Sequence, residues 1–268
     1  MKITFLLTRR VPDVPSPVLR KVCALLTRRG HLVDGWVPED RLLRTDTLLP
    51  EADLYVLKSH TEAALSVAGV LHDHGAVLLN SFPACMFAQD KITATARLRA
   101  AGVATPATWV TGDLSRAEEL LEVGPLIVKP HRGHRGAHVH LVRTPADLAD
   151  LPPVPAPAVV QRYVPGPGED LKVYVAGEQV FAVRKPFDVE SFTRPGRPVA
   201  VSREVRDLAA KVRSVFGLDL FGVDVIESPD GPVVVDVNYF PGYKGIRDTA
   251  TPIADVITAY MPTEAAVS

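Results

Sequence analysis

The sequence predicts an α/β protein, with an N-terminal parallel α/β layer followed by two α+β parts. Over residues 1–80, short apolar runs alternate with helix-like segments, which is typical of a parallel sheet with helical connections. The segments 158–186 and 220–239 instead read as strands that follow one another through turns, as antiparallel pairing requires. The proline-rich stretch Leu151–Ala158 is expected to be a linker or a surface loop.

The composition limits the possible partners. A chain of 268 residues with 47% hydrophobic and 23% charged residues is long enough for two or three packed subdomains. Its formal net charge of −1 predicts no nucleic-acid or anionic-membrane partner, and no apolar run approaches the roughly 18 residues of a membrane span. The N-terminus reads as a first strand and not as a signal peptide. Because the two cysteines, Cys23 and Cys85, have no metal or redox spacing, we expect a cytoplasmic protein.

The N-terminal part is expected to contain four strands and two helices. Ser16 and Pro17 supply a cap and a first-turn proline for the first helix, and Gly30 follows the cations at its end. The strands are expected at Lys2–Thr8, His31–Val37, Ala52–Lys58 and Ala76–Asn80, and the second helix at Thr61–His74. No GxGxxG pattern follows the first strand, so a dinucleotide site is not expected there.

The rest of the chain is expected to contain more helices and antiparallel strands. A single helix is predicted from about Phe87 to Ala101, and a short helix within 109–124. Strands are predicted at Pro125–Pro130, His138–Val142, Ala158–Val164, Leu171–Gly177 and Glu178–Pro186, and helices at Ser202–Phe216 and Thr251–Met261.

The last predicted hairpin carries polar residues on an apolar strand. If its turn is centred on Asp230, Asp224 lies opposite Asp236, with the Cβ atoms about 4.5–5.5 Å apart. Alternation puts Asn238 on the same face as Asp236. Two carboxylates this close need a proton or a cation between them, and an oxygen-only set of ligands suits Mg²⁺. The sequence therefore predicts a magnesium site, the alternative being an edge hairpin with two solvated acids.

A site for phosphate groups is expected beside Lys129. The P-loop pattern is absent, but Lys129 ends an apolar strand and is followed by Gly133 and Gly136, whose backbone N–H groups could approach an anion closely. The alternative is a strand-end lysine whose ammonium group reaches solvent. The histidines from His131 to His140 have no standard zinc spacing.

In this order, the parts resemble the ATP-grasp enzymes: an α/β domain, a helix with Asp90-Lys91, the strand PLIVKP with a glycine loop, the hinge VVQRYV, a basic hairpin, and LFGVDV…VVVDVNYFPG. KPHRGHRGAHV is similar in glycine spacing to the RimK-type amino-acid (glutamate) ligases. DLKVYVAGEQVFAVRKP and DVNYFPGY are similar to the inositol polyphosphate 5/6-kinases. The resemblance implies an ATP-grasp fold with an N-terminal α/β domain at 1–82, a central subdomain at 83–160 and a C-terminal subdomain with the metal site at 161–268.

The resemblance also implies ATP and Mg²⁺ as cofactors, with two ions expected and Mn²⁺ as an alternative. It implies that Lys91, Lys129, Gly133 and Gly136 contact the phosphates, and that Asp224, Asp236 and Asn238 bind the metal. Adenine would meet Gln161 and the backbone of Arg162, Tyr163 and Val164, and either Glu169 or Asp170 would reach the ribose. The catalytic residues facing the transferred phosphate and the acceptor would be Lys172, Arg184 and Lys185.

The function implied by this resemblance is an ATP- and Mg²⁺-dependent carboxylate–amine ligase. It would join small amino-acid substrates, glutamate among the candidates, through an acyl phosphate. The alternative is an inositol-phosphate-type small-molecule kinase, because SFTRPGR stands where the ligases often have an Arg-Ser-Asn stretch. The expected partners are a small carboxylate and a small amine, and a homodimer is left open.

Overall fold

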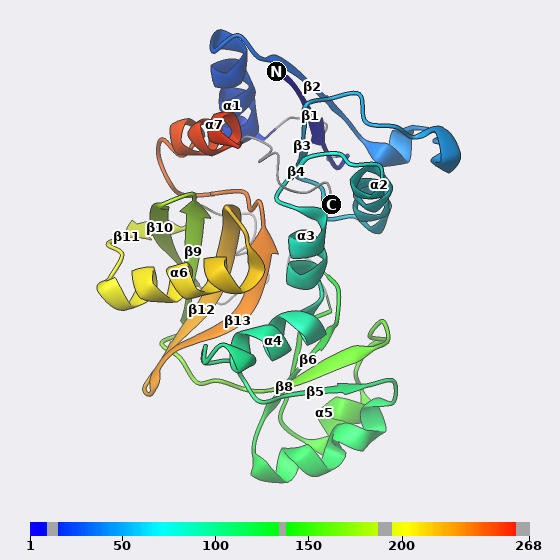
Figure 1. The fold of residues 1–268 in the computed structure, drawn as a ribbon. Helices are drawn as coiled ribbons and strands as arrows, with labels where there is room; N and C mark the ends of the chain where they lie inside the picture. The colour runs from blue at the N-terminus through cyan, green and yellow to red at the C-terminus, as the bar shows by residue number, and fades with distance from the viewer. Residues whose placement is uncertain (10–15, 134–137, 187–194, 261–268) are drawn as a thin grey trace.

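The computed structural model describes residues 1–9, 16–133, 138–186 and 195–260, which form three β-sheets with helices packed around and between them (Figure 1). The first sheet is parallel throughout, as predicted, with the strand order β2-β1-β3-β4. Its strands are β1 (Lys2–Leu6), β2 (Leu32–Trp36), β3 (Leu54–Leu57) and β4 (Leu78–Leu79).

The two helices of the N-terminal domain begin directly after Ser16 and Thr61, the first residues of the two predicted helices. They are α1 (Pro17–Arg28) and α2 (Glu62–Asp73), with the short 3₁₀ helices η1 (Pro38–Asp40) and η2 (Thr45–Thr47). The Thr61 hydroxyl accepts a hydrogen bond from the Ala64 N–H at 3.2 Å, which satisfies a free donor at the start of α2. The distant helix α7 (Ala250–Ala259) lies beside α1, where Arg29 forms an ion pair with Asp255 (Figure 1).

The single helix predicted from Phe87 to Ala101 is wrong. The structure has α3 (Phe82–Gln89) and α4 (Lys91–Ala100), separated by one extended residue, Asp90. The Asp90 carboxylate accepts hydrogen bonds from the N–H groups of Ile92 and Thr93 at 2.9 and 3.2 Å, so it caps a new helix. Lys91 consequently becomes the first residue of α4.

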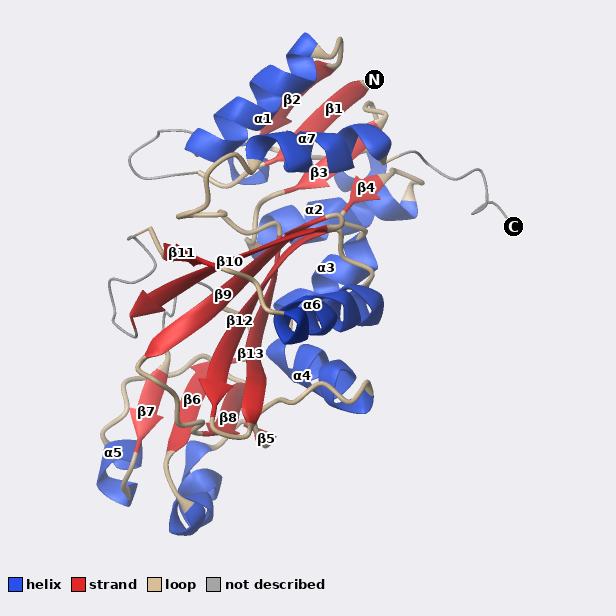
Figure 2. Ribbon diagram, turned by 90° about the vertical axis from the view of Figure 1, so that its left-hand side faces the viewer, coloured by secondary structure: helices blue, strands red, loops and turns tan. Residues whose placement is uncertain are grey.

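The second sheet is antiparallel and has a small core of its own. Its order is β5-β8-β6-β7, built from β5 (Thr108–Thr111), β6 (Leu126–Pro130), β7 (His140–Val142) and β8 (Ala158–Arg162). The short helix predicted within 109–124 is the 3₁₀ helix η3 (Leu114–Val123), which packs with α5 (Pro145–Ala149) beneath this sheet (Figure 2). The buried side chains of this core are Ala117, Leu126, Val128, Val142, Leu148 and Val160.

The third sheet is antiparallel, with the order β11-β10-β9-β12-β13. Its strands are β9 (Glu169–Ala176), β10 (Gln179–Pro186), β11 (Arg197–Val199), β12 (Leu220–Ser228) and β13 (Gly231–Tyr239). The helices α3, α4 and α6 (Arg203–Phe216) lie on one side of this sheet (Figure 2). One large hydrophobic core runs through the first sheet, these helices and the third sheet. The subdomain boundary predicted between residues 160 and 161 falls inside β8.

The predicted pairing of Asp224 with Asp236 is confirmed, but the predicted symmetry about Asp230 is wrong. The turn has only two residues between the paired Ser228 and Gly231, which alone would shift the register by one residue. Val225 pairs with Val234 and Asp224 pairs with Asp236, so Val235 is an extra residue, a β-bulge. The bulge restores the pairing that a turn centred on Asp230 would have given.

Buried hydrogen bonds fix the N-terminal domain against the third sheet. The Asn80 side chain donates to the Leu220 carbonyl at 2.8 Å and accepts from the N–H groups of Asp219 and Leu220 at 2.8 and 3.1 Å. The Tyr239 hydroxyl donates to the Ser59 carbonyl at 2.7 Å. Within the described ranges, no helix has the length and apolar character needed to cross a membrane.

Candidate nucleotide and metal site

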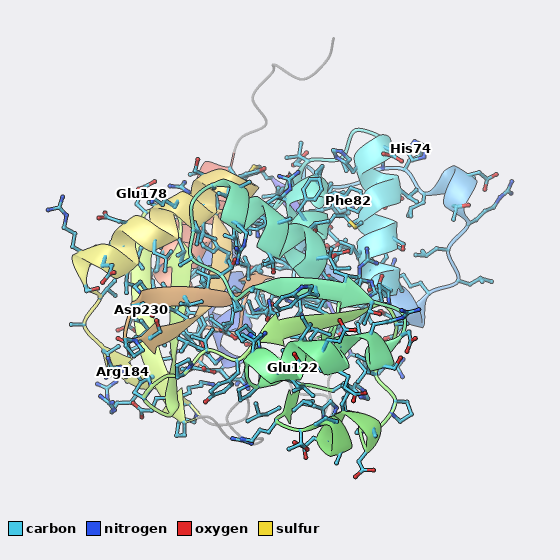
Figure 3. All side chains as sticks on the ribbon, turned by 90° about the horizontal axis from the view of Figure 1, so that it is seen from below. His74, Phe82, Glu122, Glu178, Arg184 and Asp230 are labelled. Atoms are coloured by element: carbon cyan, nitrogen blue, oxygen red, sulfur yellow. The ribbon has the colours of Figure 1, made fainter. Side chains whose placement is uncertain are left out.

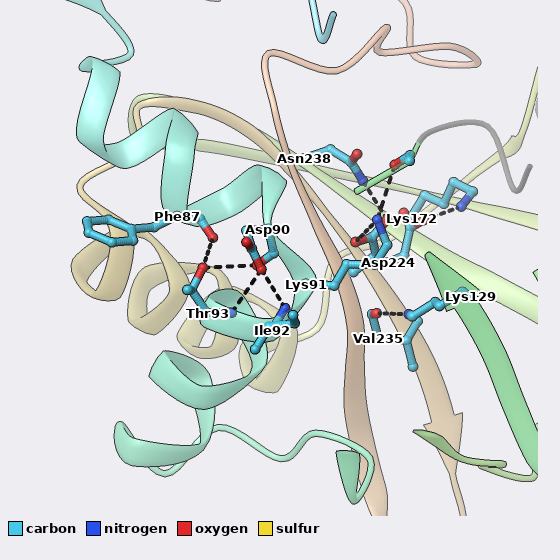
Figure 4. Close-up of polar contacts among 12 residues, drawn as sticks. Phe87, Asp90, Lys91, Ile92, Thr93, Lys129, Lys172, Asp224, Val235 and Asn238 are labelled. Carbon is cyan, nitrogen blue, oxygen red and sulfur yellow. Dashed lines mark hydrogen bonds and ion pairs between the residues drawn. The ribbon is translucent and has the colours of Figure 1, made fainter. Parts of the chain in front are cut away.

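Polar side chains form a row across the third sheet, on the face away from α6. Lys172 on β9 pairs with Asp224 on β12, and Asp224 pairs with Asp236 on β13. Paired residues of antiparallel strands project from the same face, so the three side chains are neighbours, and Asn238 follows two residues further along β13. Figure 4 shows Lys91, Lys172, Asp224 and Asn238 converging where α4 meets this hairpin.

An ammonium group satisfies Asp224. Lys172 Nζ lies 2.7 Å from Asp224 Oδ2 and 3.6 Å from Asp170 Oδ2. Burial acts to lower the pKa of Lys172, but the two carboxylates outweigh it and hold that pKa above its ordinary value. Burial raises the pKa of Asp170 to about 6, because the attraction of Lys172 compensates only in part. Asp170 Oδ1 is buried without a hydrogen-bond partner.

A second ammonium group lies beside Asp236. Lys91 Nζ is 3.6 Å from Asp236 Oδ1, and Asn238 Nδ2 is 3.5 Å from Asp236 Oδ2. Each of the facing carboxylates, Asp224 and Asp236, therefore has a lysine beside it, and these positive charges offset the repulsion expected between the two carboxylates. A contact of 3.6 Å is an ion pair and no hydrogen bond, so Lys91 remains able to accept a closer anion.

The donor set fits a magnesium ion. Both carboxylates are half-buried, with 25% and 23% of their side-chain surface exposed. Among the described residues there is no cluster of three or more histidine, cysteine or acidic side chains that could hold a metal. A metal here would therefore be held by Asp224, Asp236 and the amide oxygen of Asn238, with its remaining positions open to phosphate oxygens and water.

The two lysines predicted to bind phosphate, Lys129 on β6 and Lys91 on α4, lie beside the β12–β13 hairpin that carries the candidate metal ligands. Lys129, on β6, is buried, and its Nζ donates to the carbonyl oxygen of the bulge residue Val235 at 3.0 Å (Figure 4). Burial lowers the pKa of Lys129 to about 8. Lys91 donates to the Gly133 carbonyl at 3.1 Å, which ties the start of the predicted glycine loop to α4. Gly136 lies outside the described residues.

The predicted adenine-binding residues lie at the end of β8 and beyond it. Gln161 is buried and its amide donates to the Thr108 hydroxyl at 3.0 Å. The guanidinium of Arg162 donates to the carbonyl groups of Leu120 and Gly124. Gln161 thus joins β8 to β5, and Arg162 joins β8 to the end of η3, whereas Tyr163 is exposed and Val164 is half-buried. Their contact with adenine stays a prediction, as does that of Asp170 with the ribose.

The structure separates the two basic residues of β10. Lys185 pairs with Asp170 and so projects from the face that carries the polar row. Arg184 projects from the opposite face, where its guanidinium pairs with Glu227 at 2.8 Å. In Figure 3, Arg184 lies on the same side of the molecule as Asp230, the turn residue of the β12–β13 hairpin. The structure therefore does not bring Arg184 to the polar row.

The sequence reasoning did not find the residues on the N-terminal side of the site. A cavity of ≈ 250 Å³ adjoins Lys91, Gly133 and Asn238. Its other walls include the charged or aromatic side chains of His60, Glu62, Arg132 and Tyr239 and the amide of Gln89. The sequence did carry a signal for them, because His60 and Glu62 lie three and five residues beyond the end of a parallel strand, and ligands of parallel sheets bind beyond the carboxyl ends of the strands.

Solved structures with the same fold are ATP-grasp proteins. The RimK domain ATP-grasp protein of Sphaerobacter thermophilus has a TM-score of 0.77 at 20% identity, covering 96% of this chain and 100% of that one. D-cycloserine synthetase DcsG gives 0.73 at 19% identity (96% and 98% covered). The ATP-grasp ligase PsnB complexed with minimal precursor, Mg and ADP gives 0.68 at 21% identity (96% of each). The predicted ATP-grasp fold is confirmed.

The sequence identifies the family within this fold. The family model of the RimK-like ATP-grasp domain matches residues 88–261, and the chain belongs to this family. Three proteins named probable alpha-L-glutamate ligases are similar to it. That of Shewanella frigidimarina is 30% identical over 189 residues, that of Serratia proteamaculans 31% over 193, and that of Hahella chejuensis 32% over 203. These alignments cover 65%, 65% and 70% of this chain. The chain spans 63% of the length of the first two relatives and 67% of the third.

Proposed function

We propose that the protein is an ATP- and Mg²⁺-dependent carboxylate–amine ligase that forms an amide or peptide bond between small amino-acid substrates. The observation that carries the proposal is the convergence of Lys91, Lys129 and the oxygen donors Asp224, Asp236 and Asn238 at the junction of the second and third sheets. The names of the relatives, probable alpha-L-glutamate ligases, support glutamate as one candidate substrate.

The reaction proceeds in two substitutions. A substrate carboxylate oxygen attacks the γ-phosphorus of ATP, the bond from that phosphorus to the β,γ-bridging oxygen breaks, and ADP leaves with the acyl phosphate formed. The amine nitrogen then attacks the acyl carbon and loses a proton, and inorganic phosphate leaves.

The chain's own residues supply the charges for the first substitution. Lys91 and Lys129 neutralise phosphate oxygens, and their fixed positions avoid the reorganisation that water would need. Lys172 positions Asp224 through the 2.7 Å contact. When bound, Mg²⁺ supplies further charge neutralisation on the phosphate groups. Two ions are the proposed number.

The same proposal assigns adenine to Gln161 and the backbone from Arg162 to Val164, and the ribose to Asp170. Lys185 faces the acceptor from the polar side of the sheet. The small carboxylate and amine are the proposed partners, and the cytoplasm is the proposed location, since both cysteines are free thiols. The relatives at about 30% identity carry ligase names, which favours the ligase over the kinase alternative.

The test is the product of the reaction. The protein is incubated with Mg-ATP and pooled amino acids and, separately, with inositol phosphates, and the products are analysed by mass spectrometry. An amide together with free phosphate supports the ligase. A phosphorylated acceptor without free phosphate contradicts it. Asp224→Asn serves as the inactive control in both incubations.

A further inference from the structure

The cavity beside the nucleotide site has the size of an amino acid. It measures ≈ 250 Å³, which is less than the roughly 300–1,000 Å³ of pockets for drug-sized ligands. Lys91, Gly133 and Asn238 line it, so it is continuous with the groups proposed for phosphate and metal. The remaining lining residues come from the loop after β3, the first residue of α2, the end of α3, the turn after β6, and β13.

Groups of opposite charge meet in this cavity. Glu62 Oε2 lies 2.9 Å from Arg132 Nη1, and 62% of the Glu62 side-chain surface is exposed against 29% for Arg132. Arg132 Nε is buried without a hydrogen-bond partner, and the carboxylate of Asp90 is 4.0 Å away from it. Arg132 therefore keeps donor capacity for an anion, while Glu62 presents a carboxylate to a cation.

A separate network holds Glu62 in place. Gln89 Nε2 donates to Glu62 Oε1 at 3.3 Å and to the His60 carbonyl at 3.2 Å, and Gln89 Oε1 lies 2.8 Å from the Tyr239 hydroxyl, whose single proton is shared between Gln89 Oε1 and the Ser59 carbonyl. The rings of His60 and Tyr239 are stacked, with their centroids 4.1 Å apart. The carboxylate is thus oriented before any ligand arrives, and the stacked rings offer an apolar wall beside it.

We propose that this cavity binds a free α-amino acid as a zwitterion, with the ammonium group on Glu62 and the carboxylate on Arg132 and Lys91. This rests on the proposed function in one respect, because the bound amino acid is the substrate whose carboxylate is activated beside Asn238. The recognition follows from charge. The ammonium and carboxylate groups of an α-amino acid are separated by one carbon, and they would contact Glu62 and Arg132, which already lie next to each other as an ion pair.

The test measures binding, without turnover. Each of the twenty amino acids, its N-acetyl form and its carboxamide are titrated into the full chain by calorimetry, with Mg²⁺ and a non-hydrolysable ATP analogue present. We expect at least one free amino acid to bind, and both modified forms of it to bind about tenfold more weakly or worse, because each lacks one charge.

Two variants separate the two charges. Glu62→Gln should weaken binding of the free amino acid about tenfold and leave the N-acetyl form unchanged. Arg132→Gln should weaken the free and N-acetyl forms alike and leave the carboxamide unchanged. Asp207→Asn, which removes an exposed acid paired with Arg203 on α6, is the matched control and should bind as the wild type does. Circular dichroism spectra and melting curves verify that all variants are folded.

Binding of the N-acetyl form as strong as that of the free amino acid would overturn the proposal, as would unchanged affinity in Glu62→Gln or no binding of any amino acid. The proposed function fails differently. If amino-acid binding obeys this pattern but no amide forms with Mg-ATP, the ligase assignment is wrong and the cavity assignment stands. If amides form and Glu62→Gln keeps the wild-type KM for every amino acid, the cavity assignment is wrong and the ligase stands.

Discussion

Lys129 Nζ donates a hydrogen bond to the carbonyl oxygen of Val235, 3.0 Å away, and Val235 is the extra residue of the bulge in β13. A regular antiparallel strand directs its carbonyl groups toward its neighbours in the sheet. The bulge instead presents one carbonyl to an ammonium group from the second sheet. The two sheets that flank the candidate site are therefore joined by a buried cation.

Lys129→Met should stabilise the protein in the absence of nucleotide. Burial lowers the pKa of Lys129 to about 8, from an ordinary value of 10.5, so the buried charge costs about 3 kcal/mol at pH 7. Loss of the bond to Val235 costs about 1–1.5 kcal/mol, which leaves a net gain of about 1–2 kcal/mol. Urea unfolding at pH 7 measures this gain. The variant should also lose the rise in Tm that Mg-ATP gives the wild type.

The same lysine predicts a pH dependence. Between pH 8 and 10.5 the unfolded chain holds the Lys129 proton more firmly than the folded one, so stability from this group rises with pH in that window. From pH 7.5 to 9.5 the wild type should gain about 1–2 kcal/mol relative to Lys129→Met. Urea midpoints of the two proteins at pH 7.5, 8.5 and 9.5 provide the comparison. If the urea midpoints of the two proteins changed with pH by the same amount, Lys129 would not titrate in this range.

Asp236→Asn should remove activity and leave the unbound protein almost unchanged. The carboxylate is half-buried and its contact with Lys91 is 3.6 Å long, so its loss should change the free energy of unfolding by less than about 1 kcal/mol. Turnover should fall at least about a hundredfold, because a charge that acts on the transferring phosphate is lost. Melting curves with and without Mg-ATP and an assay for ADP give the two readouts. A wild-type shift with Mg-ATP would exclude Asp236 as a metal ligand.

Asn80→Ala should destabilise the whole molecule by about 2–4 kcal/mol. Its buried amide makes three hydrogen bonds to the backbone of Asp219 and Leu220, and truncation leaves those groups without partners. The free energy of unfolding in urea is the measurement. A loss under 1 kcal/mol would mean that water replaces the amide.

Gly245→Ala should lower the free energy of unfolding by more than an alanine substitution at another glycine with a positive φ. A Cβ on Gly245, where φ is +94°, would lie 2.8 Å from the backbone nitrogen of Gly196 and even closer to its carbonyl oxygen. Gly30 has a φ of +83° with nothing within 4 Å, so Gly30→Ala isolates the conformational cost of about 1 kcal/mol. Gly245→Ala should exceed that by about 2 kcal/mol or more. Equal losses in urea unfolding would refute the clash.

The sequence predicted the elements better than it predicted their interruptions. Caps and apolar runs located most helices and strands, because these signals are local. The break at Asp90 was missed because a capping aspartate and a helical surface aspartate look alike in one sequence. The bulge at Val235 was missed because an extra residue changes no local pattern. The error in the turn and the omission of the bulge cancelled, which is why the Asp224–Asp236 pair was found.

Residues brought together by tertiary packing were harder to predict. Alternation alone separates Arg184 from Lys185, and that was available in the sequence. The contact of Lys91 with Asp236 joins residues from α4 and β13 and has no local signal. The same holds for Glu62, the first residue of α2, and Arg132, in the turn after β6, which are 70 residues apart in the sequence.

The small core beneath the second sheet has a consequence for how the molecule unfolds. Because its apolar side chains form a cluster separate from the large core, we expect the second sheet to open as a cooperative unit while the rest stays folded. A nucleotide held by Lys129 on one unit and Asp236 on the other would couple their two equilibria. Hydrogen exchange should then report two distinct opening free energies without nucleotide and values that converge when Mg-ATP is bound. Nucleotide binding would therefore convert a chain that unfolds in two separate units into one that unfolds as a single unit.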